Sequence, residues 1–102
     1  MEKDNSITDL IEKLRPLIDL NNLEIVDHWE ADLCAIGLTK QDQTIYISTH
    51  NYQGSEVPKY DFDLEKSTGP LAHQFKVIKE GRAVSEDELL TEISNFFQRH
   101  VA

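Results

Sequence analysis

The hydrophobic positions near the N-terminus repeat with the period of a helix. Between Ser6 and about Asn22, apolar side chains recur every three or four residues and form one stripe. Ser6, with Asp9 three residues on, is the predicted N-cap. Pro16 lies inside the pattern and cannot donate a hydrogen bond to the carbonyl of Glu12, so we expect either two short helices or one bent helix.

Beyond this helix the hydrophobic period shortens to that of β-strands. The expected strands cover residues 23–29, 33–39, 44–49, 59–66 and 75–79. The segment 40–43 has the composition of a hairpin loop, 53–58 that of a longer connection and 67–70 that of a turn. Because the links between strands are mostly short, the pattern favours an antiparallel meander over β-α-β units.

The C-terminal pattern predicts a second helix. Ser85 and Glu88 have the spacing of a capping box, acidic residues follow in the first turn, and Arg99 and His100 fall in the last. Gly81 is expected to end the fifth strand and to permit the turn into this helix. The sequence therefore predicts one α+β domain over its whole length, 1–102, with a largely antiparallel sheet of about five strands flanked by an N-terminal and a C-terminal helix.

The apolar members of these patterns form the expected core. They include Ile36, Ile45, Ile47, Phe62, Leu64, Leu89, Ile93 and Phe96. Trp29 follows the parity of the apolar residues in its strand, which favours the core, but Asp27 shares that parity, so an exposed binding anchor is the alternative. Cys34 alternates with apolar neighbours and is expected as a small core residue, with a reactive thiol as the alternative.

The charge of the chain narrows the range of partners. It has 19 acidic and 10 basic residues, a net charge of -9, and the segment 22–66, which contains most of the predicted sheet, contributes -6 of it. This field repels phosphates and anionic lipids, so we expect a basic protein partner and neither nucleic acid nor membrane. The N-terminus has no signal-peptide pattern and no apolar run reaches bilayer length, so we expect a cytoplasmic protein.

The sequence contains no recognisable catalytic or cofactor motif. The histidines are His28, His50, His73 and His100, and none has metal-ligand spacing with another histidine or with Cys34, the only cysteine. No phosphate-binding glycine loop occurs either. We therefore expect no metal, no cofactor and no enzymatic activity. A small hydrolase assembled by folding from His50 and either Asp61 or Asp63 is the alternative.

An acidic strand is the most specific candidate for function. Residues 60–65 alternate between apolar and acidic side chains, so the acids project from one sheet face at intervals of about 7 Å. The polar residues of the preceding strand and an acidic loop residue adjoin this face. The predicted partner-binding residues are Tyr46, Ser48, His50, Glu56, Asp61, Asp63 and Glu65. Replacing Asp61 and Asp63 together with lysine should weaken binding far more than folding. The alternative is a face that only keeps the protein solvated.

In its overall style the chain resembles the small acidic immunity proteins of bacterial polymorphic-toxin and contact-dependent inhibition systems. The resemblance rests on an α+β pattern that is poor in cysteine, on the strand at 60–65 and on the helix start Val84-Ser85-Glu86-Asp87-Glu88. It implies an antitoxin that binds a cognate basic toxin domain, such as a nuclease, and blocks its active site with carboxylates. An adaptor or regulator of another partner is the alternative.

Overall fold

The computed structural model describes residues 2–27, 29–71 and 73–98 and confirms the α+β class. In chain order the elements are α1 (Asn5–Asn21), β1 (Glu24–Val26), β2 (Ala35–Lys40), β3 (Gln43–Ser48), the 3-10 helix η1 (His50–Tyr52), β4 (Tyr60–Ser67), β5 (Phe75–Val84) and α2 (Glu86–Gln98). In the described part of the chain, no helix has both the length and the apolar character needed to cross a bilayer.

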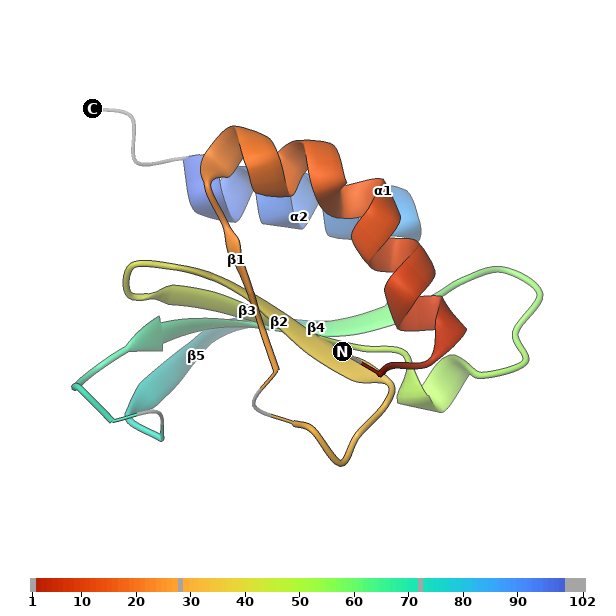
Figure 1. Ribbon diagram of the computed structural model, residues 1–102, viewed down its shortest axis with the longest axis horizontal. Helices are drawn as coiled ribbons and strands as arrows, with labels where there is room; N and C mark the ends of the chain where they lie inside the picture. The colour runs from red at the N-terminus through yellow and green to blue at the C-terminus, as the bar shows by residue number, and fades with distance from the viewer. Residues whose placement is uncertain (1, 28, 72, 99–102) are drawn as a thin grey trace.

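The five strands form one antiparallel sheet in the order β1-β2-β3-β4-β5, so the predicted meander is confirmed. Both helices lie on the same side of this sheet (Figure 1). Each helix carries a single apolar stripe, and a shared sheet face allows both stripes to be buried in one layer. Within the described residues, no α-helix covers the opposite face of the sheet.

The core lies between the two helices and the sheet. The eight residues predicted for it are all buried there, and Phe62, Ile36, Ile45, Ile47, Leu89 and Ile93 are at most 1% exposed. Alternation in the strands explains this result, because the side chains at every second position of β2, β3 and β4 point toward the helices.

The first helix differs from its prediction at the cap and matches it at the proline. The N-cap is Asp4, whose carboxylate accepts hydrogen bonds from the Ser6 backbone N–H at 3.0 Å and from the Ser6 hydroxyl at 2.6 Å. The prediction of Ser6 as the cap was wrong, because the helix begins at Asn5 and Ser6 already lies in its first turn, where its own amide needs the cap that Asp4 supplies. Pro16 lies within one continuous helix, which bends along its length in Figure 1.

The Ser85 cap predicted at the start of α2 is present. The Ser85 hydroxyl accepts a hydrogen bond from the backbone N–H of Glu88 at 3.1 Å, and three acidic residues occupy the first turn of the helix. Both features stabilise the amides and the positive dipole end of a helix N-terminus. The predicted basic residues of the last turn, Arg99 and His100, lie outside the described residues.

The fifth strand is longer than expected because Gly81 lies inside it. Gly81 pairs with Phe62 across the β4–β5 ladder, and a Cβ at this position would overlap the Phe62 ring. The prediction that Gly81 ends the strand was therefore wrong: the missing side chain makes room for a core aromatic ring. The strand continues to Val84, which is buried and pairs with Tyr60.

Replacing Phe96 with alanine should lower the free energy of unfolding by roughly 3 to 5 kcal/mol, because its ring is 3% exposed and contacts Phe97 edge-on. Urea denaturation followed by circular dichroism measures the change. Leu20, in the last turn of α1, is 72% exposed and is the matched control. Equal stability of the Phe96→Ala and Leu20→Ala variants would contradict the placement of Phe96.

Candidate functional site

The sheet face opposite the helices, called the open face below, holds most of the predicted site residues. In an antiparallel ladder, directly paired residues share a face. Three cross-strand rows therefore define it: Val26, Gly37, Tyr46, Asp63 and Glu80; Glu24, Thr39, Thr44, Glu65 and Val77; and Ala35, Ser48 and Asp61. The register confirms the sequence prediction that Asp61, Asp63 and Glu65 share one face with Tyr46 and Ser48.

Trp29 lies on the open face and not in the core. Its ring is edge-on to the Tyr46 ring, with centroids 4.7 Å apart. A Cβ at Gly37 would lie 3.0 Å from the Trp29 ring and 2.9 Å from Val26, so this glycine provides the floor on which the indole packs. The core prediction for Trp29 was wrong, because β1 ends at Val26 and the strand parity does not extend to residue 29. Trp29 is half-buried.

A buried lysine holds the loop that carries Trp29. The Lys3 ammonium donates hydrogen bonds to the Asp27 carboxylate at 2.8 Å, to the Trp29 carbonyl at 3.2 Å and to the Asp32 carbonyl at 2.8 Å. The Lys3 side chain is 0% exposed, and that of Asp27 is 23% exposed. Three acceptors match the three donors of an ammonium group, which offsets the cost of burying its charge. The loop between β1 and β2 is therefore tied to the N-terminal segment.

Asp61 is buried and supports the fold. Its Oδ1 accepts hydrogen bonds from the Tyr52 hydroxyl at 2.5 Å and from the Ala83 backbone N–H at 3.1 Å, and its Oδ2 accepts one from Asn51 at 3.3 Å. Ala83 has a φ of 54° in a bulge of β5 opposite Asp61. Burial favours a higher pKa for Asp61, but these hydrogen bonds outweigh it and leave the pKa below 3.8. The expectation that Asp61 is a dispensable exposed carboxylate was wrong.

Asp63 has a basic partner on the neighbouring strand. Arg82 Nη1 lies 3.1 Å from Asp63, and Arg82 Nη2 lies 3.5 Å from Glu80. The same guanidinium donates to the Phe62 carbonyl at 3.0 Å. The hydrogen bond from Arg82 to Asp63 raises the pKa of the arginine above its usual value. Arg82 therefore offsets part of the negative charge that Asp63 and Glu80 place on the open face.

Glu65 is a half-buried carboxyl group next to Asp63 on the same strand face. Burial raises its pKa from 4.5 to about 6, and the charge of Asp63 adds to the increase. It is paired with Thr44 and Val77 in the ladder. Glu65 is therefore mostly ionised at neutral pH. Because burial disfavours this charge, its ionisation lowers the stability of the folded protein.

A cavity of about 240 Å³ lies at the end of the open face. It is lined by Asp32, Tyr46, Ser48, His50, Asn51, Asp61 and Arg82. His50 is exposed at the start of η1, and the Ser48 hydroxyl accepts a hydrogen bond from its backbone N–H at 3.2 Å. Four of the seven predicted residues thus meet at this cavity. Glu56 is exposed in the loop before β4, and its neighbour Ser55 lines a different cavity beside α1.

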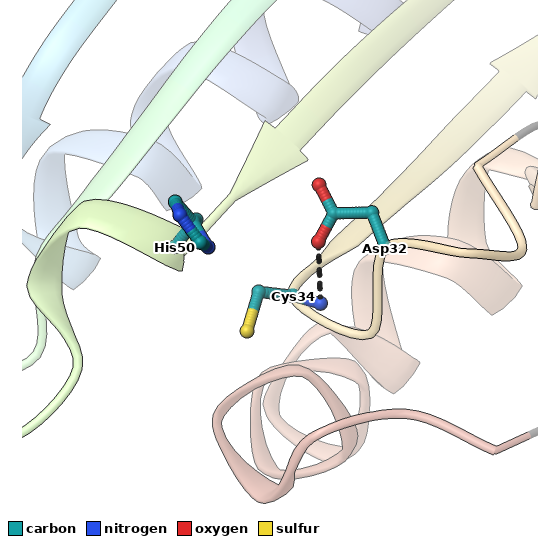
Figure 2. Close-up of side chains that lie close together, drawn as sticks. All are labelled: Asp32, Cys34 and His50. Atoms are coloured by element: carbon teal, nitrogen blue, oxygen red, sulfur yellow. Dashed lines mark hydrogen bonds between the residues drawn. The ribbon is translucent and has the colours of Figure 1, made fainter.

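The structure also gathers three residues that the sequence analysis did not combine. A carboxylate oxygen of Asp32, the Cys34 Sγ and a ring nitrogen of His50 all lie within 4.8 Å of one another. Figure 2 shows them where β2 begins and β3 has just ended. In the sequence, no histidine has metal-ligand spacing with Cys34, so nothing there pointed to this cluster. The sequence separation between Cys34 and His50 concealed the cluster, which the hairpin closes.

Comparisons with known proteins contribute no assignment: no family model, no curated protein and no solved structure matches the chain.

Replacing Asp61 with asparagine should lower the free energy of unfolding by roughly 1.5 to 3 kcal/mol at pH 7, because it removes a charge that accepts three partly buried hydrogen bonds. Chemical denaturation measures the loss. Asp63→Asn is the control and should cost less than about 1 kcal/mol, because its partner Arg82 is 51% exposed. Since the pKa of Asp61 is lowered on folding, the stabilisation is present above pH 3.8 and should fade as the pH falls below it. Equal losses in both variants at pH 7 would contradict the supporting role of Asp61.

Replacing Glu65 with glutamine should raise the melting temperature at pH 7.5. The pKa of Glu65 rises from 4.5 to about 6 on folding, so the folded state binds more protons between these values and wild-type stability falls as the pH increases through them. The advantage of Glu65→Gln should therefore shrink toward pH 4.5. Thermal melts across this range measure it, with Glu80→Gln, an exposed carboxyl on the same face, as the control. A pH-independent difference would contradict the raised pKa.

Proposed function

We propose that this protein is a binding module whose open face docks a basic protein domain, and that it serves as a cytoplasmic immunity protein for a cognate toxin. The proposal assigns it no reaction of its own. A nuclease domain is the best-defined candidate partner, because its phosphate-binding active site presents the cationic surface that an acidic face fits.

The observation that carries this proposal is the combination of acids and aromatic rings on a sheet face that neither α1 nor α2 covers. Glu24, Glu65 and Glu80 lie in its cross-strand rows, and Trp29 packs with Tyr46 at its centre. Tryptophan and tyrosine are enriched among the residues that dominate binding energy at interfaces. Aromatic anchors surrounded by carboxylates are a fitting arrangement for a basic protein surface.

The acidic residues and the aromatic residues would act at different steps of binding. The net charge of -9 accelerates encounter with a basic domain at low salt. Contacts with the aromatic pair exclude water and slow dissociation. At the far end of the open face, Phe75 is 45% exposed and Val77 is 37% exposed, which extends the apolar contact area along the edge strand β5. Occupation of the toxin's active site by this surface would block access of its substrate.

The geometry changes which residues should be tested. Asp61 supports the bulge in β5, so a lysine substitution there would disturb the fold along with the surface, and Asp63 is half-buried and accepts a hydrogen bond from Arg82 at 3.1 Å. Glu24 and Glu80 are exposed members of the open face, and the contact between Glu80 and Arg82 is longer, at 3.5 Å, and solvent-exposed. They test the same charge hypothesis with the least effect on folding.

The partner is first captured from the native cell with the wild-type protein and identified, and its isolated domain is then used for binding titrations at two salt concentrations. Changing Glu24 and Glu80 together to lysine should weaken binding roughly ten- to hundredfold at low salt, and less at high salt, because complementary charge is lost. The melting temperature should change little.

The matched control carries the same change of charge on the other side of the molecule. Glu12 and Asp19 are exposed on α1, so their double lysine variant alters the net charge equally but leaves the open face intact. Binding that falls equally in both double variants would indicate a general charge effect and would contradict docking through the open face. A captured partner that is not basic, or whose activity persists in the complex, would contradict the immunity function.

A further inference from the structure

We propose that Asp32, Cys34 and His50 form a binding site for a divalent transition metal ion, with zinc as the preferred ion. This inference goes beyond the proposed docking function and does not depend on it. The three residues come from two segments, the loop that leads into β2 and the start of η1, that lie side by side in the hairpin (Figure 2).

The donor set selects the class of metal. A thiolate and an imidazole favour zinc and related transition metals, whereas magnesium and calcium prefer oxygen donors alone. Cysteine, histidine and aspartate are each regular zinc ligands, and three protein ligands with a fourth position open to water are a known form of zinc site. The carboxylate and thiolate together neutralise the two positive charges of the ion. This balance limits the cost of placing the ion beside the buried Cys34.

The geometry requires only a small contraction. The three ligand atoms lie within 4.8 Å of one another. Around a tetrahedral zinc ion, with bonds of about 2.0 to 2.3 Å, the ligand atoms are roughly 3.3 to 3.6 Å apart. The separations therefore need to shorten by at most about 1.5 Å. The exposed ring of His50, in a single turn of 3-10 helix, can move by this amount through rotation of its side chain.

Neighbouring groups orient the ligands. Asp32 Oδ1 accepts a hydrogen bond from the Cys34 backbone N–H at 2.9 Å, which fixes the carboxylate beside the thiol. The Gln53 amide donates to the Cys34 Sγ at 2.8 Å, a contact that stabilises a metal-bound thiolate. The Thr49 backbone N–H donates to the Cys34 carbonyl at 2.9 Å and holds the two segments together. Ligand orientation is thus largely present before a metal arrives.

The test uses tag-free protein, reduced and treated with chelator, and titrates it with zinc and with cobalt(II). One equivalent of zinc should bind and should raise the melting temperature by roughly 5 °C or more at saturation, because the ion stabilises only the folded state. Cobalt(II) should produce a thiolate-to-metal charge-transfer band in the near ultraviolet, which identifies Cys34 as a ligand. Cys34→Ser should abolish the band, and His50→Ala and Asp32→Asn should each weaken zinc binding at least tenfold.

The control is His73→Ala, which removes an exposed histidine in the turn before β5 and should leave zinc affinity unchanged. Because Cys34 is buried, its variant is checked by circular dichroism, while the exposed His50 gives a variant that keeps the fold. The proposal is overturned if zinc does not bind at micromolar concentration, or if it binds equally well to wild type and His50→Ala. Absence of the cobalt charge-transfer band in the wild type would overturn it as well.

Discussion

The packing of both helices against one face of the sheet is the constraint on which the rest of the structure depends. It buries the apolar alternate positions of β2, β3 and β4 in one layer and leaves their polar partners on the other side (Figure 1). It also demands space within that layer, because the Phe62 ring occupies the position that a side chain at Gly81 would need. The packing of the helices therefore also determines which strand residues lie on the open face.

Two buried charges stabilise the edges of that surface. Lys3 holds the loop between β1 and β2 through three acceptors, and this loop carries Trp29. Asp61 holds η1 through Tyr52 and Asn51 and also holds the bulge of β5 through Ala83. Each charge is buried with hydrogen-bond partners that offset its desolvation. The segments that frame the open face are therefore fixed to the body of the fold, as a preformed binding surface requires.

This arrangement separates the acids of the open face into supporting and available groups. Asp61 accepts internal hydrogen bonds, and half-buried Asp63 accepts one from Arg82. Glu24 and Glu80 are exposed, with only a 3.5 Å contact between Glu80 and Arg82, and Glu65 is ionised near neutral pH at a cost in folding free energy. A carboxylate that folding does not need is the kind of group that a binding function would account for. The proposed partner interface rests on these groups and on the Trp29–Tyr46 pair. The proposed metal site lies at the end of the same face and would join the loop before β2 to η1.

Local periodicity in the sequence was sufficient to predict the two helices, the five-strand meander, the core residues and the common face of Asp61, Asp63 and Glu65, because alternation and helical spacing follow from backbone geometry alone. Only the tertiary structure decided that Asp61 is buried, that Trp29 packs on Gly37 and that Gly81 lies under Phe62, since each depends on contacts between segments distant in sequence. The cluster at His50 lies between these cases. Continuing the observed β2–β3 register from Ala35 and Ser48 sets His50 opposite Leu33, between Asp32 and Cys34, but only the tertiary structure brings the three ligand atoms together, because that depends on how each side chain leaves its backbone.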